Sequence, residues 1–254
     1  MENEKLKLEL NSLILKEKIF LNKKAHDNKI KQKVYEKIPD NLEELLNKAF
    51  IKAFETIFVN GTNIIEKTFD KEKIVLNHDI NKFMLDYKEN KSNIKNLDKD
   101  TKKSNFASNM FTTSVGAGMG ALGLGIPDIP VFVATMLRGI YQIVLSYGYN
   151  YEQKEEKIYI LRLIKVALAK SPTEKNKYND ELEKENYYNL DLETEIKSTA
   201  EVMSEALLFE KFIQGIPIVG VVGGVVNYSI YKKVTNFAMI KYKKRYILNK
   251  IKEK

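Results

Sequence analysis

A stripe of polar side chains runs along one otherwise apolar stretch, VFVATMLRGIYQIVLSYGY at residues 131–149. The spacings of three and four place on one helix face Thr135, Arg138, Gln142 and Ser146. A buried guanidinium requires a partner that offsets its desolvation, and the candidates are Asp128, Glu205 and Glu210. The stripe is either a satisfied buried ion pair or a polar pocket for an anionic ligand, whose candidate residues are Asp128, Arg138, Gln142, Tyr147 and Asn227.

A glycine-rich run, VGAGMGALGLGIPDIP at residues 115–130, precedes this stripe. Gly118, Gly120 and Gly123 match G-x-G-x-x-G, a pattern that cradles phosphate only between a strand and a helix. No strand pattern comes before the glycines. Ile126-Pro127-Asp128 follows where a Walker loop needs Lys-Ser/Thr. The run therefore does not predict a nucleotide site.

Other chemistry-bearing residues are few. The chain has no cysteine and two histidines, His26 and His78, so the sequence predicts no metal site and no cofactor. Neither G-x-S-x-G nor H-E-x-x-H occurs. No catalytic residue is predicted, and the balance favours a protein that is not an enzyme.

The glycines instead have the spacing of a close helix contact. Gly116 with Gly120, and Gly220 with Gly224, are four residues apart, which lets two helix backbones approach each other. Each glycine costs a helix about 1 kcal/mol relative to alanine, so a compensating contact is expected. We expect the two glycine-faced helices to pack on each other, either as a membrane hairpin or in a buried core.

Three apolar stretches approach the length of about 20 residues that a membrane span needs: 106–126, 131–149 and 212–231. Glycines and hydroxyl side chains dilute the first. Arg138 costs the second about 2.5 to 3.5 kcal/mol on insertion scales, and Pro217 would kink the third. These stretches predict association with a membrane without firm integration.

The C-terminal segment from Lys232 onward carries nine basic side chains against Glu253, a net charge of +8 that equals that of the whole chain. Apolar residues alternate with these lysines, as in a basic helix at a membrane surface. The segment predicts contact with anionic lipid through Lys232, Lys233, Lys241, Lys243, Lys244 and Arg245. Nucleic acid is an unlikely partner, because no recognition motif accompanies the charge.

The spacing of apolar residues predicts an all-α fold, a helical bundle with a glycine-rich apolar helix pair. Helices are expected from Asp40, around residues 73–87 and around 192–212. Residues 1–37 form a polar helical N-terminal extension, and 38–254 form one all-α domain. The polar segments 88–105 and 171–189 are predicted to be exposed loops.

The run GIPDIPVFVATMLRGIYQIVLSYGYNYEQKEEKIYILRLI, followed later by IPIVGVVGGVVNYSIYKKVTNFAMIKYKKRYIL, resembles the EcsC family of bacterial proteins. The resemblance covers about residues 38 to 250. It implies a helical, membrane-linked protein without an established biochemical activity, in a family named for a protein encoded beside an ABC transporter.

We therefore expect a non-enzymatic, membrane-associated helical protein that acts with a membrane complex such as an ABC transporter. It would lie in the bacterial cytoplasm, peripherally or shallowly attached to the inner face of the membrane, with anionic lipid and a membrane protein as partners. One alternative is a lipid-directed hydrolase or a protein that binds lipid or a small ligand in an Asp128/Arg138 pocket. Another is a membrane-damaging toxin or defence effector.

Overall fold

The computed structural model describes residues 3–23, 40–58, 62–98, 128–184, 187, 189–213 and 224–253. In this part of the chain every regular element is a helix, which confirms the predicted all-α fold. The helices are α1 (Glu4–Asn22), α3 (Asp40–Thr56), α4 (Thr62–Glu66), α5 (Lys71–Tyr87), α6 (Lys91–Asn96), α9 (Asp128–Ser146), α10 (Lys154–Leu168), α11 (Pro172–Leu182), α12 (Leu192–Ile213) and α13 (Gly224–Lys252).

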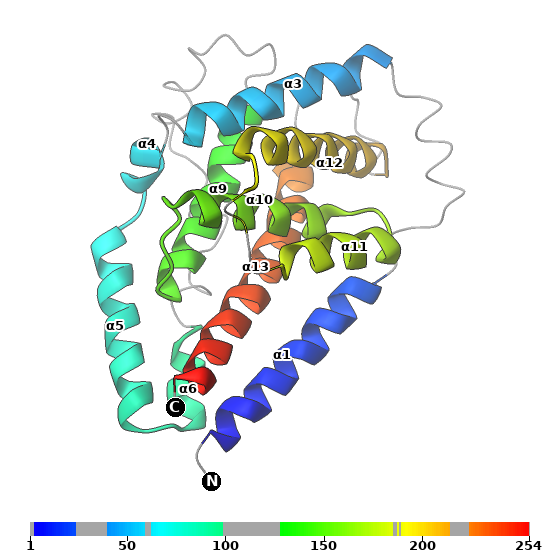
Figure 1. Ribbon diagram of the computed structural model, residues 1–254. Helices are drawn as coiled ribbons and strands as arrows, with labels where there is room; N and C mark the ends of the chain where they lie inside the picture. The colour runs from blue at the N-terminus through cyan, green and yellow to red at the C-terminus, as the bar shows by residue number, and fades with distance from the viewer. Residues whose placement is uncertain are drawn as a thin grey trace.

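Two long helices, α9 and α13, organise the packing (Figure 1). Helix α9 contacts α3, α5 and α13, whereas α13 contacts α1, α9, α10 and α12. Helices α3 and α12 pack together across one end of the molecule, and α1 and α5 flank opposite sides of α13. The leucines on the inner face of α1 belong to the same core as the residues of α9. One continuous core therefore joins the first helix to the last.

Helix α9 is apolar on nearly all sides because it is enclosed by other helices. The window Ile129–Ser146 has the length and composition of a membrane span, and 94% of it is buried inside the protein. That burial is typical of a core helix in a bundle. The predicted stretches 106–126 and 212–231 lie wholly or partly outside the described residues.

Helices α9 and α13 approach each other closely at Gly139, which is not one of the glycines of the predicted pair. Gly139 of α9 faces the ring of Tyr231 of α13, and a Cβ atom there would lie 2.6 Å from Tyr231 Oη. Gly224 is the first residue of α13, whereas the other glycines of the predicted pair lie outside the described residues: Gly116, Gly120 and Gly220. The observed contact joins α9 to α13, and the predicted packing of the two glycine runs stays a prediction.

Gly148 ends α9 and sets the direction of the chain that follows. Its φ of 78° is in the left-handed region, and its N–H donates to Leu145 O at 2.9 Å. Tyr149 N–H donates to Val144 O at 3.0 Å. These two bonds form a Schellman motif, which satisfies the last carbonyls of α9. The motif directs Tyr149 toward α13, where its ring contacts Tyr242.

Two segments predicted to be exposed loops contain helices. The prediction for 171–189 is wrong over Pro172–Leu182, where α11 forms, and Lys91–Asn96 in the segment 88–105 forms α6. Helix α11 begins with the Ser-x-x-Glu sequence of a capping box: Ser171 Oγ accepts from Glu174 N, and Glu174 Oε2 accepts from Lys170 N, one residue before the cap. Helix α6 begins at Asn90, whose side chain accepts from Asn93 N. Caps and a few buried side chains make these polar segments helical.

The contact at Gly139 predicts a stability change that depends on Tyr231. Gly139→Ala should lower the free energy of unfolding by about 1 to 2 kcal/mol, because the buried Tyr231 ring must move. In a Tyr231→Ala background the same change should be neutral or stabilise by up to about 1 kcal/mol through helix propensity. Urea denaturation of the four proteins measures both values. An equal effect of Gly139→Ala in both backgrounds would show that the ring contact does not limit the packing.

Candidate functional site

Arg138, the charged residue of the predicted stripe, binds the turn between α4 and α5. Its Nε donates to Thr68 Oγ1 at 2.8 Å and its Nη2 donates to Thr68 O at 2.7 Å. Two of its expected partners lie elsewhere, because Glu205 pairs with Lys170 at 2.7 Å and Glu210 pairs with Lys233. Arg138 therefore fastens the α4–α5 turn to α9.

The other pocket candidates belong to α9, to the residue that follows it, and to α13. Gln142 is buried, whereas Tyr147 Oη donates to Asp98 Oδ1, beyond the end of α6, at 2.9 Å. Asp128 is the first residue of α9, and Asn227 lies in the first turn of α13. Thr135 and Ser146 donate to carbonyls of α9 itself. The structure thus brings Arg138 and Tyr147 to different neighbours.

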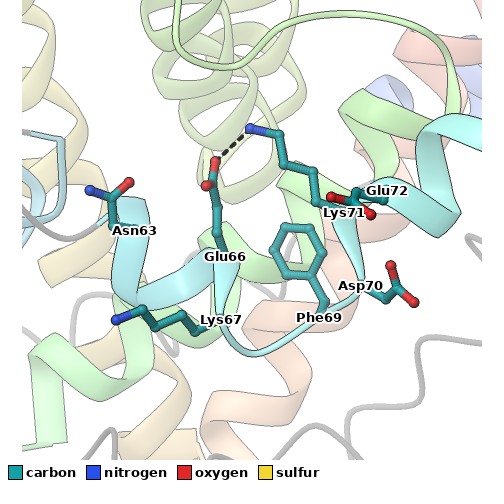
Figure 2. Close-up of a pocket in the computed structure, with 7 residues that line it drawn as sticks. All are labelled: Asn63, Glu66, Lys67, Phe69, Asp70, Lys71 and Glu72. Carbon is teal, nitrogen blue, oxygen red and sulfur yellow. Dashed lines mark hydrogen bonds and ion pairs between the residues drawn. The ribbon is translucent and has the colours of Figure 1, made fainter.

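A shallow, open pocket lies beside the turn that Arg138 holds (Figure 2). Its lining residues are Asn63, Glu66, Lys67, Phe69, Asp70, Lys71 and Glu72. Lys71 Nζ pairs with Glu66 Oε1 at 2.9 Å, and Tyr151 Oη donates to the same oxygen at 2.5 Å. Burial raises the pKa of Glu66, but these hydrogen bonds outweigh it and hold the pKa below its usual value. The carboxylate is therefore an ionised group that is paired with Lys71 and Tyr151.

Helix α13 turns most of its predicted lipid-binding residues inward. Lys241 is 1% exposed, and its Nζ donates to Glu17 of α1 at 2.6 Å, to Asn179 of α11 at 3.0 Å and to Glu183. Lys244 donates to Glu17 Oε2 at 2.6 Å. These two lysines cannot form an exposed basic surface in this structure, because α1 and α11 cover them.

Lys243 occupies a second buried ion pair. Its Nζ lies 2.7 Å from Glu9 of α1 and 3.0 Å from Asp98. Lys233 pairs with Glu210 of α12, and Lys232 lies at the surface beside the ring of Tyr228. The basic residues that appear consecutive in the sequence thus point in different directions around α13. Of the six residues predicted to contact anionic lipid, Lys241, Lys243 and Lys244 are thus paired with carboxylates inside the protein, whereas contact of the segment with lipid stays a prediction.

Arg245 lies between aromatic rings. Its Cζ is 4.1 Å from the ring centroids of both Tyr149 and Tyr159. Its Nη1 and Nη2 donate to the two carboxylate oxygens of Glu156 at 2.8 and 3.1 Å, and Tyr242 Oη donates to Glu156 at 2.5 Å. Burial raises the pKa of Tyr149 to about 12 although the Arg245 charge lowers it, so this hydroxyl stays protonated at neutral pH. We call this arrangement the Arg245 cluster.

A further ion pair network joins α10 to α12. Glu195 accepts from Arg162 Nη2 at 2.6 Å and from Lys165 Nζ at 2.9 Å. Burial raises the pKa of Glu195, but the hydrogen bonds from both cations outweigh it and keep the pKa below its usual value. In the Arg245 cluster one guanidinium faces one carboxylate, whereas Glu195 balances one of the two cations that bind it, and Arg162 also donates to the Glu181 carbonyl. In the part of the chain that the structure describes, no group of acidic or histidine side chains could hold a metal ion.

The outer face of α1 is exposed and combines apolar side chains with lysines, unlike the buried ion pairs described above. Helical spacing places Leu8, Leu15 and Ile19 on one stripe, where they are 64%, 59% and 62% exposed, and Ile14, 46% exposed, lies beside this stripe. Helical spacing places exposed lysines on both sides of this stripe: Lys7 and Lys18 on one side, Lys5 and Lys16 on the other. The acids Glu9 and Glu17 point inward to α13. We call this surface the α1 outer face. The many charged residues of this segment led to the prediction of a polar extension and obscured the apolar stripe.

The Arg245 cluster predicts that charge alone cannot replace the guanidinium. Arg245→Lys should lower the free energy of unfolding by about 1 to 3 kcal/mol, since an ammonium cannot bind both oxygens of Glu156 or stack between two rings. Lys232→Gln, on the exposed side of the same helix, is the matched control and should change stability by less than about 0.5 kcal/mol. Urea denaturation measures both. Equal stability of the Arg245→Lys protein and the parent would contradict a structural role for the cluster.

Comparison with known proteins identifies relatives of the chain. The model of the EcsC protein family matches residues 11–247, which extends the resemblance into α1. Protein EcsC of Bacillus subtilis (strain 168) is 24% identical over 207 residues, 80% of this chain and 78% of that protein. "Uncharacterized protein YdbA" of the same organism is 28% identical over 145 residues, 54% of this chain but only 52% of that protein. No solved structure matches significantly. The chain belongs to the EcsC protein family.

Proposed function

We propose that this protein is a non-enzymatic helical protein of the bacterial cytoplasm that binds the anionic inner surface of the membrane through the α1 outer face. There it would act with a membrane complex such as an ABC transporter, as the family resemblance suggests. The single observation that carries the membrane contact is the exposed stripe of Leu8, Leu15 and Ile19 with lysines on both sides.

This arrangement suits the boundary between water and lipid. Full burial of one leucine or isoleucine side chain contributes about 1.5 to 3 kcal/mol, and three such side chains are exposed on one stripe. Each lysine near an anionic leaflet contributes about 1 kcal/mol. Lysine stems also lie along apolar surface while their charges stay in water. Within α1, Glu4 is the one exposed acidic residue. The α1 outer face therefore favours anionic lipid over neutral lipid.

Because the lysines of α13 form ion pairs inside the protein, we place the proposed membrane contact on α1 and not on α13. Lys241, Lys243 and Lys244 are neutralised by carboxylates of α1 and its neighbours, so their charge is unavailable to lipid headgroups. The same ion pairs hold the inner face of α1 on α13. Phe20 stacks on Phe237 with ring centroids 4.6 Å apart, which adds an apolar contact. The lysines of α13 thus hold α1 in place through ion pairs on its inner face.

The membrane contact is testable because the chain contains no tryptophan. A Leu15→Trp protein should show a blue-shifted emission maximum with vesicles that contain phosphatidylglycerol, and little shift with phosphatidylcholine alone, because indole would enter the apolar boundary. Replacing Lys5, Lys16 and Lys18 with Gln should weaken binding at least about tenfold, and high salt should weaken it as well. Titration with vesicles measures both.

Substitutions on α5 test whether vesicle binding is specific to the α1 outer face. Replacing Lys67, Lys73 and Lys82 with Gln removes the same charge from exposed positions on and beside α5, and should leave binding within about twofold. A Leu76→Trp reporter on α5 should not shift. The membrane proposal fails if Leu15→Trp emission is unchanged by anionic vesicles, or if the two triple variants weaken binding equally.

A further inference from the structure

Helix α5 lies at the edge of the helical bundle (Figure 1). It presents apolar side chains on the face opposite its core contact. Leu85 is buried toward the core, and His78 is buried with its Nδ1 3.0 Å from Ser146 O of α9. The opposite face carries four residues that are each more than half exposed: Leu76, Ile80, Phe83 and Tyr87. We call these four residues the α5 seam. Several exposed large apolar residues on one helix face mark an interaction site.

The spacing of the α5 seam indicates what it fits. Its members are separated by four, three and four residues, which is the a and d repeat of a coiled coil. Phe83 and Tyr87 stack with ring centroids 6.5 Å apart, so the two rings form one surface. Side chains in this register insert between those of a second helix. The seam therefore has the form of one half of a helix pair.

Acidic side chains run along one edge of the seam. Glu72, Asp79 and Asp86 recur every seven residues, at the g position of the same heptad. All three are exposed. Asp86 binds Lys250 of α13 at 2.9 Å, whereas Glu72 and Asp79 have no ion pair partner among the described residues. Residues at e and g positions choose the partner by charge, so this edge selects a basic helix.

We propose that the α5 seam docks one amphipathic helix of a partner protein, with an apolar heptad stripe and Lys or Arg residues facing Glu72 and Asp79. A second copy of α5 fits poorly. An antiparallel pair would set the acidic edges against each other, and a parallel pair would set them against Asn77 and Met84. An anionic bilayer is disfavoured by the same acidic edge. This docking uses a different helix from the membrane contact and does not depend on it.

The test uses a synthetic peptide as a stand-in for the partner helix. A fluorescein-labelled peptide of three heptads, with Leu and Ile at a and d and Lys at e and g, is compared with its twin carrying Glu at e and g. Fluorescence anisotropy with the full chain should give a Kd at least about tenfold lower for the Lys peptide. Glu72→Lys/Asp79→Lys should reverse this preference. Ile80→Gln/Phe83→Gln should abolish binding of both peptides.

Two controls separate this proposal from the membrane contact. Leu8→Gln/Leu15→Gln on the α1 outer face should leave peptide binding unchanged, and Ile80→Gln/Phe83→Gln should leave vesicle binding unchanged. Circular dichroism checks that each variant retains its helices. The docking proposal is overturned if neither peptide binds or both bind equally. Self-association of the parent chain that Ile80→Gln/Phe83→Gln abolishes would overturn it in favour of a second copy. Vesicle binding lost in that variant would overturn it in favour of lipid.

Discussion

The buried lysines of α13 constrain the arrangement of the helices around them. Lys241 and Lys243 are almost completely enclosed, and an unpaired ammonium in that position would cost several kcal/mol. Each therefore requires carboxylates from other helices, which α1 provides through Glu17 and Glu9. Charge neutralisation thus fixes the position and rotation of α1 on α13, in a way that apolar packing alone does not.

The buried lysines of α13 are thus paired inside the protein, whereas the outer surface carries two distinct helix faces. The α1 outer face combines leucine and isoleucine with lysine, whereas the α5 seam combines apolar residues with aspartate and glutamate. The proposed roles follow from these opposite charges, because an anionic bilayer and a basic helix are each attracted to one of them. With both faces in the proposed roles, the protein would hold a partner beside a membrane.

The features that depend on the local spacing of apolar residues were predictable from the sequence. The all-α fold and the helices of residues 40–56, 71–87 and 192–213 follow from helical periodicity. The capping signal Ser171-Pro172-x-Glu174 was present in the sequence and predicts α11, but the polar composition obscured it. The orientation of the α13 lysines was not predictable, since the carboxylate that binds Lys241 is 224 positions away in the chain. The net charge of a segment shows that cations are in excess. It does not show whether each cation is exposed to solvent or paired with a carboxylate that is distant in the sequence.

The contact between Glu17 and Lys241 also has a consequence for synthesis. Because ribosomes add about 5 to 20 residues per second, the 224 positions between these partners correspond to about 10 to 45 s during which α1 has emerged and α13 has not. Throughout that interval the inner leucines of α1 lack their final neighbour. The nascent chain thus exposes an apolar helix on both faces until α13 has been synthesised, and a nearby bilayer or chaperone is able to capture it before the core closes.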